Sequence, residues 1–527
     1  MFHVKHLLEK RNGVKKYMYI NPNSNIRLLH NVPLDNTYDH TLWFDSKQVQ
    51  SNYFIGLTKK NFTEQSYLRV HNGVARLDVK ADDIYDCNYM MFQNTAYGNK
   101  WFYAFINSIE YINDNCSQIN FEIDVMQTWF FDYKLEECFV EREHSITDEL
   151  FGNVVAEKLE LGEYISNNKE TFNMMPMCVC ALTSKHSSGQ PATGKTINNI
   201  YTPLNVIAGV PSTYADEINV LLERFVGAGQ EDSIVTLYQY PEFLGDGSQS
   251  EPVTKVKKIS PNLTTIDGYT PKNKKLFTYP YNYLVVSNNC GQTAEYQWEM
   301  WNDPQYCGHF SVQGVFVSTP CVLAYPQYYR GCVNDYDSGL TYSNFPQIPW
   351  VGDTYKAWLA QNKGALTSSL ISTAVGAGLV MGGAEMANPF YVSGGIESIY
   401  YGVSSAVAQG YDKSHVPPQV HGQVQCDSLN AGTSRVEFTF YSMSIRKQYA
   451  KIIDNYFSMF GYATNDVKTP NRNSRPHWNY VKTIGCVLTG SVPSDDSKTI
   501  CKIYDNGITF WKHGNEVGNY SLDNRPV

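Results

Sequence analysis

The chain has few charged residues for its length, and its acidic residues outnumber its basic ones. Charged residues make up 18% of the 527 residues, and the formal net charge is −9. A protein that grips nucleic acid along its length does so with Lys and Arg side chains that neutralise phosphates. This balance therefore argues against such a protein, although DNA could still slide past an acidic surface.

The sequence also lacks paired cysteine motifs and a secretory leader. Its 12 cysteines are scattered, only Cys178 and Cys180 lie close together, and no C-x-x-C occurs. Neither a zinc knuckle nor a thioredoxin-like site is predicted. Residues 1–16 mix cations with short apolar pairs and contain no uninterrupted apolar run. We therefore expect no secretory signal, reduced thiols, no metal site and no cofactor.

Aromatic residues, by contrast, are abundant. The chain contains 39 Tyr and 25 Phe, and aromatic side chains fit pleated, half-buried surfaces. We predict a mainly β protein with a few short helices, in about three to four domains by length. The pair Asn72-Gly73 predicts a tight hairpin turn between strands at 67–70 and 74–79.

Apolar spacing predicts two amphipathic helices, at residues 213–225 and 444–460. In the second helix we expect Lys451, Asp454 and Asn455 to face water. The residues expected to face the core are Tyr449, Ile452, Ile453, Tyr456 and Phe460.

A group of lysines between residues 255 and 275 has two interpretations. It could contact DNA or an anionic cell surface, or it could be a solvated loop. In a chain this acidic the solvated loop is favoured. The six residues are Lys255, Lys257, Lys258, Lys272, Lys274 and Lys275.

Neighbouring acids give the one simple hint of an enzyme. Glu136 and Glu137 are adjacent and would point to opposite faces of a strand, whereas Glu141 and Glu143 share a face without an identifiable partner. We therefore predict no catalytic residue. A cell-wall hydrolase, with a catalytic pair drawn from distant segments, stays open as an alternative.

The most unusual segment is Gly364–Gly410, which contains no Lys or Arg and only two acids. Residues 365–384 carry no charge over the length that a helix needs to cross a hydrocarbon layer of ~30 Å. Gly378 and Gly382 form a G-x-x-x-G motif, which lets helices approach closely in membranes. After a turn at Asn388-Pro389, aromatic residues suggest the return limb of a hairpin.

We predict that this segment is a membrane-active loop. Large apolar residues are few, so conditional insertion is favoured over permanent insertion. An ionised carboxylate is costly in hydrocarbon, so Glu385 and Glu397 are expected to be sensitive to pH. The residues assigned to membrane contact are Leu366, Leu370, Ile371, Val375, Gly378, Leu379, Val380, Met381, Gly382, Phe390, Val392, Ile396 and Ile399.

Two other interpretations of the segment remain open. It could be a buried helical hairpin or a Gly- and Ser-rich loop within a soluble domain. The apolar hairpin would also suit a soluble pore-forming toxin, although such a toxin would ordinarily be exported.

Several longer strings resemble the tail knob proteins of small short-tailed bacteriophages with protein-primed genomes. They occupy both ends of the chain and cover about half of it. The strings are Tyr89–Asn94, Tyr97–Phe105, Phe121–Trp129 and Phe139–His144, followed by the C-terminal run Tyr456–Asn524 with Phe460–Tyr462, Trp478–Val481, Asp505–Trp511 and Gly518–Tyr520.

The resemblance implies a structural virion protein at the distal end of the phage tail, made in the host cytoplasm. In that family, multidomain β-barrel or sandwich subunits form a hexameric tube through which genomic DNA passes without specific binding. A long apolar loop blocks the lumen before infection and then interacts with host membrane lipids. By position, Gly364–Gly410 matches that loop. The implied partners are the other five copies and the upper tail tube.

The resemblance also implies a domain arrangement. Residues 1–165 would form an N-terminal β tube domain, and 426–527 a C-terminal β segment that returns to it. Residues 353–425 would be the apolar loop and its flanks. Residues 166–352 would form a middle β-rich knob domain, where the resemblance is weaker.

Overall fold

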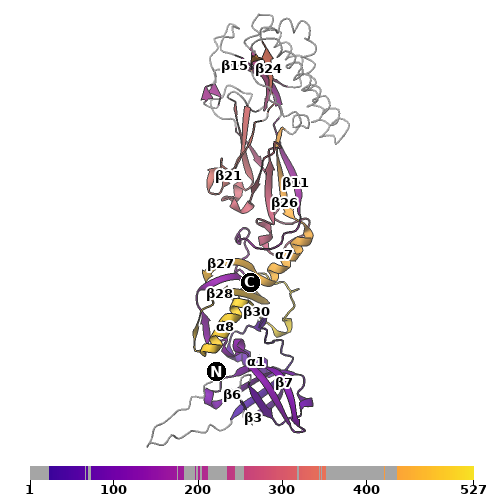
Figure 1. The fold of residues 1–527 in the computed structure, drawn as a ribbon, viewed down its shortest axis with the longest axis vertical. Coiled ribbons are helices and arrows are strands. Elements are labelled where there is room, and N and C mark those ends of the chain that lie inside the picture. Colours follow the sequence, from indigo (N-terminus) through magenta and orange to yellow (C-terminus); the bar gives the residue numbers. More distant parts are fainter. Residues whose placement is uncertain are drawn as a thin grey trace, which may run out of the picture. The chain divides into compact units, whose positions relative to one another are not determined.

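The computed structural model assigns the chain to a mainly β fold, as predicted (Figure 1). The chain divides into two units: unit 1 comprises residues 1–160, 270–276 and 448–527, and unit 2 comprises residues 161–269 and 277–447. The structure describes residues 23–65, 67–68, 73–174, 176–182, 196–197, 200–201, 205–211, 234–241, 243, 254–316, 320–343, 345, 347–351, 420–421 and 436–527.

Unit 1 contains a seven-stranded sheet in the order β3-β1-β6-β7-β8-β5-β4. All of its neighbouring strands pair antiparallel. The strands are β1 (Ser24–His30), β3 (Thr58–Gln65), β4 (Tyr67–Leu68), β5 (Val74–Leu77), β6 (Cys87–Asn94), β7 (Phe102–Asn113) and β8 (Cys116–Ile123).

A second sheet of unit 1 joins both ends of the sequence, in the order β2-β30-β28-β10-β27. Figure 1 shows the yellow C-terminal strands beside the purple strand β10. Its strands are β2 (His40–Leu42), β10 (Cys138–Glu143), β27 (Tyr462–Lys468), β28 (Trp478–Ile484) and β30 (Ile508–Trp511), and the short pair β9 (Tyr133–Leu135) and β29 (Leu488–Gly490) lies apart from it.

Four α-helices are described. α1 (Lys47–Gly56) begins after Ser46, whose hydroxyl accepts from Val49 N, and α2 (Val125–Trp129) begins after Asp124, whose carboxylate accepts from Gln127 N. Such side-chain caps satisfy amide donors that have no partner within the helix. The other two helices are α7 (Lys447–Phe460) and α8 (Ser494–Asn506).

The core of unit 1 packs against both faces of the larger sheet at β6. Along β6, Met90 and Phe92 lie in one apolar cluster, whereas Tyr89 and Met91 lie in another. Alternate residues of a strand point to opposite faces, so this strand is buried on both sides. The first cluster includes Tyr504 of α8. The second includes Phe54, Trp478 and Trp511.

Unit 2 is built from antiparallel sheets, whereas in unit 1 β2 pairs parallel with β30. One has the order β11-β26-β18-β19, a second β17-β20-β21-β22 with β23 beside β21, and a third β15-β12-β16-β24-β25. The strands are β11 (Tyr164–Asn173), β12 (Pro176–Leu182), β15 (Asn205–Pro211), β16 (Ile234–Pro241), β17 (Thr254–Lys258), β18 (Asn282–Ser287), β19 (Thr293–Tyr296), β20 (His309–Phe316), β21 (Pro320–Tyr329), β22 (Cys332–Asn334), β23 (Leu340–Tyr342), β24 (Gln347–Val351), β25 (Val420–His421) and β26 (Glu437–Ile445), with β13 (Thr196–Ile197) paired to β14 (Ile200–Tyr201).

The predicted hairpin is confirmed in its pairing, because β4 and β5 pair antiparallel with Leu68 opposite Val74. Asn72, the first residue of the predicted turn, lies outside the described residues. Gly73 has φ +76°, and an added Cβ there would lie 2.7 Å from the Phe121 ring. The glycine is therefore required both by the backbone conformation and by close packing.

Candidate functional site

The residues predicted to contact membrane all lie outside the described residues. This holds for the apolar positions between Leu366 and Ile399 and for Glu385 and Glu397. The predicted helix at 213–225 lies outside them too. Among the helices that the structure describes, none combines the length and the apolar character that crossing a bilayer requires.

A short segment of unit 1, Thr270–Leu276, has unit 2 sequence on both sides. We call it the strap. Asp454 of α7, which is 0% exposed, binds it through its carboxylate and its backbone carbonyl. Its carboxylate accepts from Lys272 N at 2.8 Å, from Asn273 N at 3.0 Å and from Asn273 Nδ2 at 2.8 Å. Hydrogen bonds to a charged acceptor are about twice as strong as neutral ones, so this aspartate anchors the strap.

The prediction that Asp454 faces water was wrong, and Ile452, predicted to face the core, is 65% exposed. The buried residues of α7 are Ala450, Ile453, Asp454 and Phe457. Apolar spacing alone assigns a carboxylate to the outer face. It cannot reveal that the strap supplies three donors to this one.

A second buried carboxylate, Glu157, also holds the strap. Its side chain is 1% exposed, pairs with Arg142, and accepts from Lys275 Nζ at 2.6 Å. It also accepts from Ala463 N at 2.8 Å. Two cations and an amide compensate for taking this acid out of water, as a buried charge requires.

The prediction of solvated lysines is confirmed for Lys255, Lys258, Lys272 and Lys274, which are exposed, and is wrong for Lys275. This lysine is buried, and burial lowers the pKa of its ammonium although Glu157 acts in the opposite direction. Lys257 pairs with Glu170 at 2.8 Å. The two lysines therefore serve intrachain ion pairs.

The acids considered as catalytic candidates are engaged structurally. Glu143 is buried, pairs with Lys468 at 2.6 Å and accepts from Asn471 N at 2.7 Å. Glu141 pairs with Lys482 at 2.9 Å. Glu136 accepts from Thr489 Oγ1 at 2.6 Å. None of these contacts pairs two carboxylates.

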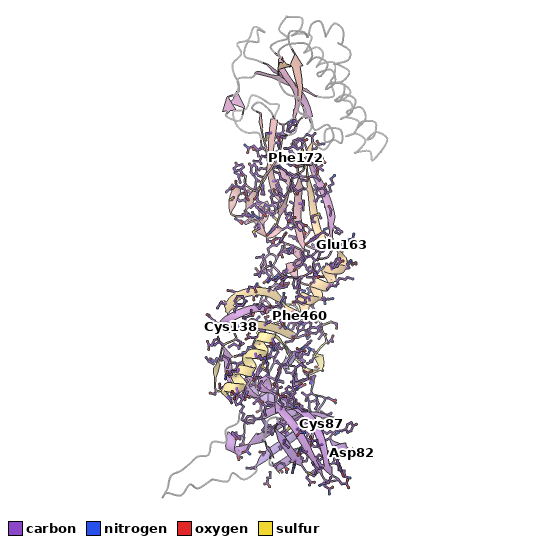
Figure 2. The ribbon with its side chains drawn as sticks, in the orientation of Figure 1. Asp82, Cys87, Cys138, Glu163, Phe172 and Phe460 are labelled. Atoms are coloured by element: carbon purple, nitrogen blue, oxygen red, sulfur yellow. The ribbon has the colours of Figure 1, made fainter. Side chains whose placement is uncertain are left out.

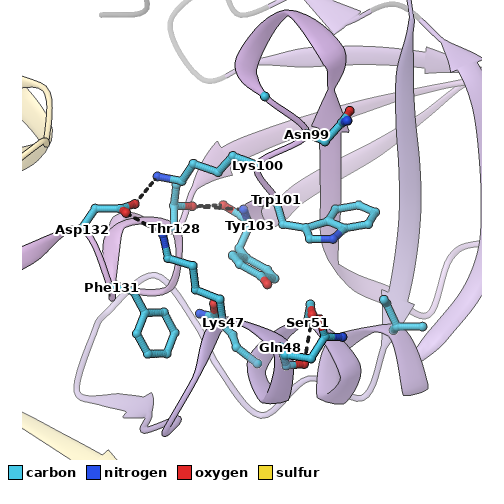
Figure 3. A pocket seen from close by; sticks show the side chains of 13 residues that line it. Lys47, Gln48, Ser51, Asn99, Lys100, Trp101, Tyr103, Thr128, Phe131 and Asp132 are labelled. Atoms are coloured by element: carbon cyan, nitrogen blue, oxygen red, sulfur yellow. Dashed lines mark hydrogen bonds and ion pairs between the residues drawn. The ribbon is translucent and has the colours of Figure 1, made fainter.

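A cavity of about 450 Å³ opens between α1 and the loop before β7 (Figure 3). Asp132 lies at its edge and binds Lys47 Nζ at 2.8 Å and Lys100 Nζ at 2.6 Å. The Lys100 ammonium lies 3.3 Å from the centre of the Trp129 ring. Trp101 and Phe131 provide apolar lining. The cavity lies where three segments of unit 1 meet. Both of its lysines are engaged within the chain, by Asp132 and, for Lys100, also by Trp129.

One face of the larger sheet is open and polar where β7, β8 and β5 meet. Asn120 Nδ2 donates to Ser108 Oγ at 2.8 Å and to Glu110 Oε1 at 2.5 Å. Gln118 Nε2 donates to Glu110 Oε2 at 3.0 Å, and Arg76 Nε donates to Gln118 Oε1 at 3.0 Å. We call these five residues the polar ladder. The opposite face of β8 carries buried residues such as Ile119 and Phe121.

No three His, Cys, Asp or Glu side chains within the described ranges come together in a way that could hold a metal ion. Nine of the cysteines in those ranges are free thiols. Burial raises the pKa of Cys87 and of Cys307 to about 11. A thiol of that kind is a poor nucleophile.

Comparisons with known proteins agree with this arrangement of sheets without a catalytic cluster in the described parts. A family model described as the C-terminal domain of Bacillus phage phi29 tail knob protein gp9 matches residues 247–525, which is more than half of the chain. A second model, the N-terminus of caudoviral major tail proteins, matches residues 22–134.

Whole-chain relatives point the same way. The tail knob proteins gp9 of Bacillus phages PZA and phi29 are each 27% identical to this chain, over 95% of it and 98% of their own length. The solved tail knob protein gp12 of bacteriophage C1 has a TM-score of 0.60 and 15% identity, over 96% of this chain and 100% of that one. At that identity the likeness shows the fold alone.

The fold and these matches define a class, the structural tail proteins of bacteriophages. Within that class the chain belongs to the family of the phi29 tail knob protein gp9. It is a component of the virion, located at the tail, and not an enzyme. The resemblance noted in the sequence is therefore confirmed.

Proposed function

We propose that six copies of this chain form the distal tube of the tail, close it before infection, and then conduct the genome into the host cell. Membership of the tail knob family carries this proposal. Other tail proteins, in particular the upper tail tube, would hold the opposite end. In this proposal the subunit acts through the assembly that it forms with the other copies.

The polar ladder is suited to line such a passage. Its members satisfy one another by hydrogen bonds, and it contains one arginine and one glutamate. Duplex DNA is retained mainly by Lys and Arg contacts to phosphate. A face without an excess of cations would let the genome pass without binding it specifically.

The charge-free span at Gly364–Gly410 would close the tube and later enter the membrane. Apolar segments from six copies can bury against one another, and the same gain from leaving water favours entry into lipid. Six copies acting together would offset the weak insertion tendency of each. The proposed contacts with lipid are those of the apolar positions between Leu366 and Ile399, such as Leu379.

The proposal assigns a separate role to each part of the chain. Residues 1–165 and 426–527 would build the tube domain, and 166–352 a knob domain. Residues 353–425 would supply the membrane-active loop and its flanks. Electron microscopy of the purified protein tests the assembly directly, because the proposal requires six-fold rings with an occluded centre.

Deletion of residues 364–410 tests the membrane role. We expect the variant to form the same rings but to lose leakage of dye-filled liposomes, since only the charge-free span is removed. Leu379→Lys should also reduce leakage, because a lysine at the centre of a membrane helix costs about 2.5–3.5 kcal/mol. Val467→Lys, on a strand residue that is already 63% exposed, is the matched control.

Two results would contradict the proposal. Loss of ring assembly on deletion would make the span part of the structural core. Leakage caused equally by monomers and rings would indicate a pore-forming protein that acts without the tail.

A further inference from the structure

The short helix η1 (Ala81–Asp83) packs beside β7, and the segments 81–86 and 111–114 both carry exposed tyrosines and acids. Tyr85 is 78% exposed and Tyr111 is 63% exposed. Tyr111 Oη donates to Asp114 Oδ1 at 2.9 Å, and Asp82 acts on the same phenol electrostatically. We call Asp82, Tyr85, Tyr111 and Asp114 the tyrosine–acid patch. Figure 2 labels Asp82 near Cys87.

The patch keeps uncompensated negative charge. The neighbouring acids Asp83 and Asp86 pair with Lys60 at 3.3 Å and Lys59 at 2.5 Å. Asp82 and Asp114 have no ion pair in the described part of the chain. The Lys59 ammonium lies 5.8 Å from the centre of the Tyr85 ring, so this ring already attracts a cation. Exposed rings beside carboxylates that have no ion pair in the described residues fit a ligand that is both apolar and basic.

The first 22 residues of the sequence have that composition. They contain one acid, Glu9, and five cations, so their formal charge is +4, and the remaining residues carry −13 to give −9 in total. They also contain large apolar residues. The cations are Lys5, Lys10, Arg11, Lys15 and Lys16, and the apolar residues include Phe2, Leu7, Leu8, Tyr17, Tyr19 and Ile20.

We propose that residues 1–22 dock on the tyrosine–acid patch. The length of this segment is sufficient. β1 begins at Ser24 opposite Asn94, and the patch lies beyond the other end of β6. Eight residues of strand span about 26 Å, whereas 22 residues extend to roughly 75 Å. Lysine and arginine side chains of the segment would meet Asp82 and Asp114, and its apolar residues would cover Tyr85 and Tyr111.

A binding measurement tests the docking. A fluorescein-labelled peptide of residues 1–22 is added to the chain that lacks residues 1–22, and fluorescence anisotropy is recorded. We expect saturable binding that weakens as salt rises from about 50 to about 300 mM, because exposed charge pairs are screened. Asp82→Lys and Tyr111→Ser should each weaken binding about tenfold, which corresponds to 1.4 kcal/mol.

Matched variants and a competitor make the result decisive. Glu149→Lys removes an exposed acid elsewhere in unit 1, and it should leave the affinity within about twofold of the unsubstituted value. Equal weakening by Asp82→Lys and Glu149→Lys would overturn the proposal, because only overall charge would then matter. So would tighter binding of the peptide to a DNA duplex than to the chain.

A second measurement uses the full chain, in case the truncated chain does not fold. Trypsin cleaves after Lys and Arg, so docking should protect the sites between Lys5 and Lys16. We expect these sites to be cut several-fold faster in Asp82→Lys than in Glu149→Lys, in the regime where cleavage tracks the open population. Equal rates in the two variants would overturn the proposal.

Discussion

The contacts of His144 require that it be neutral. The ring is 3% exposed. Its Nδ1 accepts from Tyr480 N at 2.8 Å, so its Nε2 carries the proton and donates to Ser458 O at 3.1 Å. Burial, with help from Arg475 and Arg142, lowers the pKa of this histidine to about 3. Protonation of Nδ1 would also leave the Tyr480 amide without its acceptor.

This histidine makes folding stability depend on pH. The ordinary pKa of 6.5 applies in the unfolded chain. Below that pH the unfolded chain binds a proton that the folded chain does not, so stability is complete above pH 6.5 and is lost as pH falls toward 3. At about pH 5 the loss is about 2 kcal/mol. His144→Asn should remove this loss, as measured by urea unfolding at pH values of about 7 and 5.

The comparison must be made between variants because Asp124 acts in the opposite direction. Burial raises the pKa of Asp124 to about 6, so its contribution is present at low pH and is lost as pH rises from 3.8 through 6. The contribution of Asp124 is the same in His144→Asn and in the unsubstituted protein, so it cancels when the two are compared. His513→Asn, at an exposed histidine, is the matched control. If the free energy of unfolding of His144→Asn depends on pH as strongly as that of the unsubstituted protein, His144 does not cause this dependence.

At the scale of single elements, the close approach of α7 to β10 depends on glycine. Gly461 follows the helix, has φ +65°, and its N–H donates to Phe457 O at 2.9 Å. A Cβ there would lie 2.2 Å from Glu143 O, whereas Gly485, with φ +67°, has nothing within 4 Å. The two positions therefore share a conformational cost but differ in available space.

Alanine substitutions separate these two effects. Gly485→Ala should lower the free energy of unfolding by about 1 kcal/mol, the cost of a left-handed backbone for a residue with Cβ. Gly461→Ala should cost about 2 kcal/mol more, because the backbone of β10 must shift. Chemical denaturation of both variants measures the difference. Equal losses would show that β10 yields freely and that close packing plays no part.

Local patterns predicted elements better than they predicted the partners of individual side chains. The helix expected at 444–460 is present as α7, and the strands about Asn72-Gly73 do pair. Asp454 and Lys275 were misassigned to solvent because their partners come from segments far away in sequence. Whether a charged side chain is buried depends on its hydrogen-bond and ion-pair partners. The local spacing of apolar residues does not predict these partners.

At the scale of the whole molecule, composition and family strings predicted the mainly β fold and the tail knob family. The strap could not be predicted. Its place in unit 1 depends on Asp454 and Glu157, each of which reads in sequence as an ordinary surface acid. The cavity beside Lys100 was missed for the same reason, since it joins residues from three separate segments.

The proposed membrane step has its own pH dependence, set by the two acids of the charge-free span. An ionised carboxylate opposes entry into hydrocarbon, and a protonated one opposes it far less. Glu385→Gln with Glu397→Gln should therefore raise liposome leakage at about pH 7.5 toward the level that the unsubstituted protein reaches at about pH 5. The doubly substituted protein should then respond little to acid. Glu149→Gln, at an exposed acid of unit 1, is the matched control. If the unsubstituted protein leaks dye equally at both pH values, these two acids do not limit insertion, and the release of the span is controlled by assembly alone.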